Sequence, residues 1–132
     1  MGKRYEFRPE QGGRNRYIGS WSETTPQAVP LQWSAASLQT VLAWGADPDS
    51  SPYSHQSIAH WCDQFTVAHM DADLQDDAEL QRALAIATVV DCQWDLYLAN
   101  TYSLDQLQQL DFSSVRLPLD WFRSWQDQLG SR

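Results

Sequence analysis

Residues 54–70 read Ser-His-Gln-Ser-Ile-Ala-His-Trp-Cys-Asp-Gln-Phe-Thr-Val-Ala-His-Met, and this stretch indicates the class of fold more clearly than any other. Its larger apolar groups and one histidine share a single stripe at helical spacing: Ile58, Trp61, Cys62, Phe65 and His69. The other side is polar and carries Gln56, His60, Asp63 and Gln64. Such a one-sided stripe is typical of an amphipathic helix that covers a core. The stretch therefore predicts a helix from about residue 54 to residue 70.

The segments on both sides of this stretch predict two more helices. Residues 31–44 show helical spacing and are followed by Gly-Ala-Asp-Pro, which contains typical stop signals. A third helix is expected to start among the carboxylates of residues 73–79, which suit the positive end of a helix. It continues through residues 83–90, whose side chains are apolar on every side and so indicate a central, buried element. The β-branched residues of this segment leave a buried strand as the alternative, but the helical neighbours favour a helix.

Two further helices are predicted in the last third of the chain. The sequence Ser-Leu-Asp-Gln at residues 103–106 has the form of a capping box, which predicts a short helix to about residue 110. A last helix is expected over residues 118–129, with Pro118 in its first turn and Gly130 as its stop. The predicted fold is therefore mainly α, with four to five helices in a single compact domain.

The first thirty residues differ in character from the rest of the chain. Two aromatic-bearing runs flank a Gly-Gly pair at residues 12–13, which predicts either a small N-terminal β-hairpin or an extended basic arm. A Pro-rich linker, residues 25–30, follows. We therefore divide the chain into a basic arm or hairpin with its linker, residues 1–30, and an acidic helical domain, residues 31–132.

Composition places the chain among ordinary folded proteins. Its 132 residues are 42% hydrophobic and include seven Trp, far from the low-hydrophobicity mixture of disordered chains. The chain has no run of eighteen apolar residues, and its first residues lack the apolar stretch of a secretory signal, so we expect no membrane association and a cytoplasmic location. Cys62 and Cys92 have neither metal-binding nor disulfide-framework spacing and are expected to be reduced.

Charge is unevenly distributed along the chain. Residues 17–115 carry thirteen Asp or Glu and one basic side chain, Arg82, whereas the first sixteen residues carry a net charge of +3. An acidic surface of this kind attracts cationic partners and repels phosphate, so direct nucleic-acid binding is disfavoured despite the basic arm. The expected partner is a basic protein. Self-association, with the arm of one copy on the acidic body of another, is the alternative.

Five carboxylates within nine residues form the main candidate for a partner-binding surface: Asp71, Asp73, Asp76, Asp77 and Glu79. The segment is not a calcium-binding loop of the EF-hand type. If Asp71 is its first ligand, Asp76 stands where the loop needs Gly, and Arg82 stands where it needs a bidentate Glu. A solvated helix start remains the alternative to a docking surface. Trp121, beside Arg123 on the flank of the last helix, is a second candidate because Trp and Arg are enriched in binding hot spots.

A metal or catalytic site has weaker support. His55, Cys62 and His69 lie seven residues apart, roughly 10 Å along a helix, which is too far for one ion. The remaining candidates for metal ligands are His60, Asp63, His69 and Asp73. Asp91 falls on the inward stripe of the third helix, so we expect a buried carboxylate with a structural partner.

The function classes follow from these features. No nucleophile, phosphate-binding or zinc-protease motif is present, and no cofactor is expected. The leading hypothesis is a non-enzymatic acidic domain that docks on a cationic partner surface, of the inhibitor or immunity type. The alternatives are an assembly factor or scaffold, and a small metal-dependent or acid–base enzyme that uses His60, Asp63, His69, Asp73 and Asp91.

Overall fold

The structure is a computed structural model that describes residues 25–130. Within these residues the chain forms five α-helices and one short 3₁₀ turn and no strand: α1 (Ala35–Ala46), α2 (His55–Ala68), α3 (Ala78–Thr101), α4 (Leu104–Gln109), η1 (Phe112–Ser114) and α5 (Leu119–Gly130). The predicted mainly helical fold is confirmed, and residues 83–90 are helix rather than strand. The predicted hairpin or arm falls on residues 1–24, outside the described residues.

Side-chain caps decide where the helices begin. Four helices start directly after a residue whose side-chain oxygen accepts a hydrogen bond from the backbone N–H three positions on: Ser34, Ser54, Asp77 and Ser103. The capping box predicted at Ser103 is present, with Gln106 accepting from the Ser103 backbone N–H at 2.7 Å. Because Ser34 caps α1, this helix begins at Ala35 and not at residue 31 as predicted.

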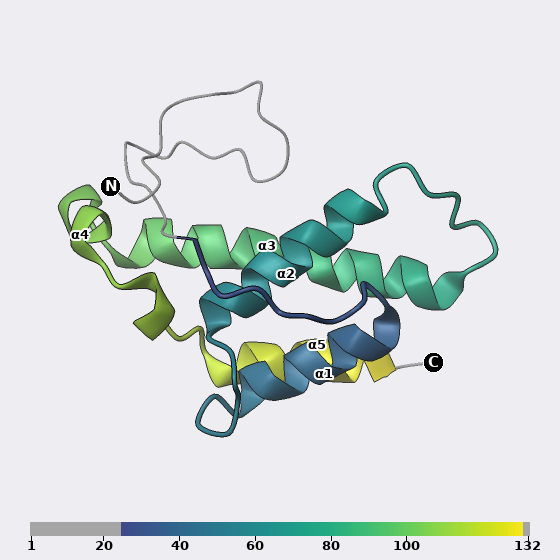
Figure 1. Ribbon diagram of the computed structural model, residues 1–132, viewed down its shortest axis with the longest axis horizontal. Coiled ribbons are helices and arrows are strands. Elements are labelled where there is room, and N and C mark those ends of the chain that lie inside the picture. The colour runs from purple at the N-terminus through teal and green to yellow at the C-terminus, as the bar shows by residue number, and fades with distance from the viewer. Residues whose placement is uncertain (1–24, 131–132) are drawn as a thin grey trace.

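The helices pack as two pairs (Figure 1). In one pair α2 lies against α3, and in the other α1 lies against α5. The core between them contains large side chains that are fully or almost fully buried: Trp61, Phe65, Trp94, Phe112 and Phe122. Residues 25–34 cross this arrangement in extended form, and the Trp61 indole N–H donates to the Leu31 carbonyl at 3.2 Å. The segment before α1 is thereby tied to α2.

Helix α3 is less buried than predicted. Ala83, Ile86, Ala87 and Val90 are buried, but Ala85, Thr88 and Val89 are exposed, so residues 83–90 are not enclosed on every side. The physical reason is that α1, α2 and α5 cover the inner side of α3, whereas its outer side faces solvent. None of the helices in residues 25–130 has the length and apolar character that crossing a membrane requires.

The first turns of α2 show the opposite deviation. His55, Gln56, Ser57, Ile58 and Ala59 are all buried, although Gln56 was predicted on the polar side. Here α2 lies close to α1 on one side and to η1 on the other, so the first turns are enclosed around the whole circumference of the helix. The amphipathic pattern predicted for residues 54–70 holds only further along, where Phe65 is buried and Gln64 is exposed.

Candidate functional site

The carboxylates of residues 71–79, from here on the acidic loop, lie in the connection between α2 and α3 and in the first two residues of α3. This connection forms the end of the molecule opposite α4 (Figure 1). Backbone turns shape it: the Ala72 N–H donates to the His69 carbonyl at 3.1 Å, and the Asp77 N–H donates to the Leu74 carbonyl at 3.0 Å. All five of its carboxylate residues are exposed.

Two of the five carboxylates have a local structural role at the helix start. Asp77 Oδ1 accepts from the Leu80 N–H at 2.9 Å and caps α3, and Glu79 lies in the first turn. Asp73 Oδ1 accepts from the Gln75 N–H at 3.1 Å within the loop. Among the described residues no cation pairs with any of the five. The acidic loop is therefore both a capped helix start and a continuous negative segment open to solvent.

The rest of the described chain does little to neutralise this charge. Residues 25–130 contain fourteen Asp or Glu and three Arg, a net charge of −11. Arg116 pairs with Asp49 at 3.3 Å and Arg123 pairs with Asp120 at 2.9 Å. Both pairs are exposed, so each removes one acidic charge locally and adds little stability.

Trp121 lies on α5 as a half-buried residue. Its ring meets the ring of Tyr97 on α3 edge to face, with centroids 6.0 Å apart, and lies 6.2 Å from the ring of Trp125. Part of Trp121 thus supports the contact between α3 and α5, and part remains open to solvent. Trp121 lies near the start of α5, whereas the acidic loop connects α2 to α3, so the two candidates belong to separate parts of the fold.

The candidate metal ligands are not gathered into a metal centre. His69 Nδ1 lies 3.1 Å from the Phe65 carbonyl of its own helix, and its ring packs edge to face on Phe65 with centroids 5.0 Å apart. His60 and Asp63 lie on α2, whereas Asp73 belongs to the acidic loop. No group of three or more His, Cys, Asp or Glu side chains in residues 25–130 has the geometry to hold a metal ion.

Asp91 occupies a partly buried position on α3 that faces α2. Its Oδ1 atom is shielded from solvent. Burial raises the pKa of the Cys62 thiol well above its usual range, and the nearby charges of Asp91 and Asp63 raise it further. Cys62 therefore stays a protonated, inert thiol of the core.

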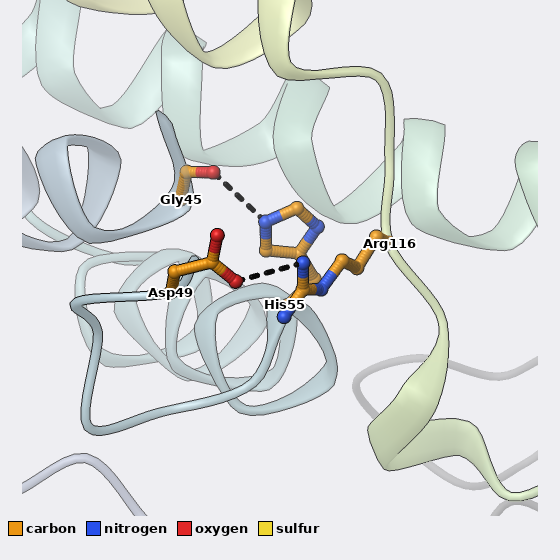
Figure 2. Close-up of polar contacts among 4 residues, drawn as sticks. All are labelled: Gly45, Asp49, His55 and Arg116. Atoms are coloured by element: carbon orange, nitrogen blue, oxygen red, sulfur yellow. Dashed lines mark hydrogen bonds and ion pairs between the residues drawn. The ribbon is translucent and has the colours of Figure 1, made fainter. Parts of the chain in front are cut away.

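A buried histidine forms a polar connection whose partners the sequence did not indicate (Figure 2). His55 Nδ1 accepts a hydrogen bond from the Leu117 backbone N–H at 2.8 Å. Since that N–H can only donate, the ring proton is on Nε2, which lies 2.9 Å from the Gly45 carbonyl and donates to it. The ring also packs on Phe122, with centroids 4.4 Å apart. One side chain thus joins the start of α2 to the end of α1 and to the segment before α5.

A small polar hollow of about 180 Å³ lies beside this histidine. Figure 2 shows the Asp49–Arg116 ion pair, and Arg116 also lines the hollow. Its lining is mostly polar and includes Ser51, Tyr53, Ser113 and Arg116. Both ring nitrogens of His55 are engaged with backbone groups, so neither is free to move a proton for a bound molecule. The hollow does not have the arrangement of an acid–base site.

Stability is expected to depend on pH through His55. Burial lowers its pKa below 6.5, the Gly45 hydrogen bond opposes this shift, and the charge of Arg116 adds to it. The unfolded chain therefore binds a proton that the folded chain does not. The contribution of His55 to the free energy of unfolding is fully present above the unfolded pKa of 6.5. It is lost as the pH drops below that value, with a limiting slope of about 1.4 kcal/mol per pH unit. Urea unfolding between pH 8 and pH 5.5 measures this slope. A His55→Gln variant should lose the dependence, and an unchanged slope in that variant would contradict the assignment.

Comparison of this chain with protein-family models, with curated proteins and with solved structures finds no match.

Proposed function

We propose that this protein is a non-enzymatic acidic domain that docks on a cationic surface of a partner protein, as an inhibitor or immunity-type protein does. The observation that carries the proposal is the charge of the helical fold. Residues 25–130 contain fourteen carboxylates and only three arginines. The five carboxylates of the acidic loop are exposed, and no cation in residues 25–130 pairs with them. A basic protein is the partner that this surface recognises.

The expected role of the charge is to guide association. Complementary fields raise the association rate constant by ten- to a thousandfold at low ionic strength, and they exclude partners of the same sign. Because exposed charges are screened over about 8 Å at physiological salt, the effect falls steeply as salt is added. An acidic face can also occupy a surface that its partner uses for phosphate, which is how such a domain would inhibit a nucleic-acid-binding protein.

The alternative functions are an assembly factor or scaffold and a metal-dependent enzyme. An assembly factor or scaffold would use the same acidic surface and differ only in its partner. The metal-dependent enzyme finds no support in residues 25–130, since His60, Asp63, His69 and Asp73 do not converge with other ligands on one point. A cytoplasmic location, where Cys62 and Cys92 would stay reduced, belongs to the proposal.

Neutralising the acidic loop is expected to weaken capture of the partner. The loop variant carries three substitutions that keep the capping residue Asp77 and change only charge: Asp71→Asn, Asp73→Asn and Asp76→Asn. Proteins captured from lysate by the unmodified protein should be basic and should be released at about 0.5 M salt. The loop variant should capture them several-fold less well, with a roughly tenfold lower association rate constant for the identified partner.

A matched control separates the acidic loop from total charge. It removes three exposed carboxylates elsewhere in the fold: Asp47→Asn, Asp105→Asn and Asp111→Asn. This control variant has the same net charge as the loop variant and should capture nearly as well as the unmodified protein. Equal losses in the two variants would show that the acidic loop is not the docking surface, and capture that is insensitive to salt would refute docking through charge.

A further inference from the structure

The exposed positions of α3 between residues 85 and 96 are uncharged, although the described chain carries a net charge of −11 and the half-buried Asp95 borders them. Every exposed side chain of this helix from residue 85 to residue 96 is uncharged: Ala85, Thr88, Val89, Cys92 and Leu96. Val89 is 43% exposed and Leu96 is 49% exposed, which is high for large apolar residues. A contiguous apolar stripe on an otherwise polar surface is typical of a binding face.

An open groove of about 280 Å³ lies between α3 and α5, beside this stripe. Val89 and Gln93 of α3 form one side, and Trp121, Ser124 and Trp125 of α5 form the other. The tryptophan rings are held in place, because Trp125 packs on the buried Phe122 with centroids 5.1 Å apart and Trp121 packs on Tyr97. The groove thus exists before anything binds, which reduces the entropy lost on binding.

The rim of the groove on α5 carries a net charge of −1, from Asp120, Asp127 and Arg123. Asp120 and Asp127 lie one helical turn before and after Ser124, so they flank it on the surface of the helix. Arg123, the only basic residue of α5, pairs with Asp120 at 2.9 Å, and Asp127 is exposed. A partner's side chain that enters the groove between Val89 and Trp121 contacts apolar groups, so we expect it to be apolar. Groups beside it on the α5 side meet negative charge.

We propose that this groove binds an amphipathic helix of a cationic partner, with one or two aliphatic side chains inserted beside Trp121 and with Lys or Arg side chains near Asp127. Recognition of an amphipathic helix in an apolar groove is a common binding mode, and its anchors recur at positions i, i+3, i+4 and i+7. This inference rests on the proposed function and names the partner's chemistry. The acidic loop would guide the partner's approach, whereas the groove would set how slowly the complex dissociates.

Two synthetic peptides of sixteen residues test the proposal. Both contain the same number of Leu and Lys, but only one has all its Leu on a single helical face. Fluorescence of the tryptophans and a titration by calorimetry report binding at low and at physiological salt. We expect the amphipathic peptide to bind at least tenfold more tightly than the scrambled one, and to keep that advantage at physiological salt, where guidance by charge is weaker.

Substitutions in the groove show where the peptide binds. Val89→Gln should weaken binding of the amphipathic peptide about tenfold, and Ser124→Tyr, which fills the groove from an exposed position, should have a similar effect. The matched control is Val67→Gln, the same change at a valine of α2 that is 44% exposed and outside the groove. Its affinity should equal that of the unmodified protein.

Each result that would contradict the binding groove points to a different explanation. Equal, salt-sensitive affinity for both peptides overturns the groove and leaves docking through charge in place. Failure of both peptides to bind overturns the groove and the proposed function together. A loss of affinity in Val67→Gln but not in Val89→Gln overturns the groove in favour of apolar contacts beside the acidic loop. Binding that appears only when residues 1–24 are removed, or dimerisation that Val89→Gln abolishes, assigns the groove to the chain itself and overturns the external partner.

Discussion

Replacing His55 with alanine is expected to lower the free energy of unfolding by about 3–5 kcal/mol. The change removes a ring that is only 2% exposed and packs on Phe122. It also leaves two backbone groups without their partner. The Leu117 N–H loses its acceptor at 2.8 Å, and the Gly45 carbonyl, one of the last carbonyls of α1, loses its donor at 2.9 Å. Each such buried group costs about 1–3 kcal/mol when it is left unsatisfied.

Two conservative variants separate these contributions. His55→Asn keeps an oxygen near the position of Nδ1 and should preserve the bond from Leu117, whereas His55→Gln keeps an N–H near the position of Nε2 and should preserve the bond to Gly45. Each is expected to lose roughly half as much stability as the alanine variant. Urea unfolding at pH 8, followed by tryptophan fluorescence, measures all three in a state where the histidine is neutral. A loss below about 1 kcal/mol in His55→Ala would show that the histidine does not hold the fold together.

Replacing Gly45 with alanine should destabilise the protein by about 3 kcal/mol, although alanine is the better helix former by about 1 kcal/mol. A Cβ at this position would lie 2.7 Å from Cγ of Phe122 and closer still to its Cδ1 and Cε1. Phe122 is fully buried, so its ring has no room to move aside. The glycine is therefore required for the close approach of α1 to α5, and the same substitution at Gly130, where a Cβ meets nothing within 4 Å, should be harmless.

A double-mutant cycle tests the cause of this effect. Phe122→Leu removes the ring atoms that the new Cβ would meet. In that background Gly45→Ala should cost at least about 1 kcal/mol less than in the unmodified protein, since residues in contact show coupling energies of this size. Additive losses in the cycle would contradict the clash and would point instead to an effect on α1 alone.

The helices were predictable because their signals are local. Helical spacing over residues 54–70 and the capping box at Ser103 depend on residues within one or two turns, and both predictions are confirmed. Helix α1 begins four residues later than the apolar spacing from residue 31 predicts, because Ser34 caps it. A side chain that satisfies a free N–H fixes a helix end more firmly than periodicity does.

Burial was predictable only in part. The apolar composition of residues 83–90 indicated a helix enclosed on all sides, yet Val89 is exposed because no described element covers the outer side of α3. In the opposite case, Gln56 is buried because both α1 and η1 approach the start of α2. Composition reports how apolar an element is, but its neighbours determine how much of it is covered.

The helical class, the order of the helices and the strongly acidic charge, including the five carboxylates of the acidic loop, can all be predicted from the amino-acid sequence. These properties depend on residue types and on contacts between near neighbours, which a linear pattern contains. Two arrangements become visible only in the folded protein: His55 joins Gly45 to Leu117, ten and sixty-two residues away in the chain, and Val89 and Trp121 line one groove. The physical reason is that both arrangements require helices from distant parts of the chain to pack together, and packing depends on the shapes of all the side chains at once.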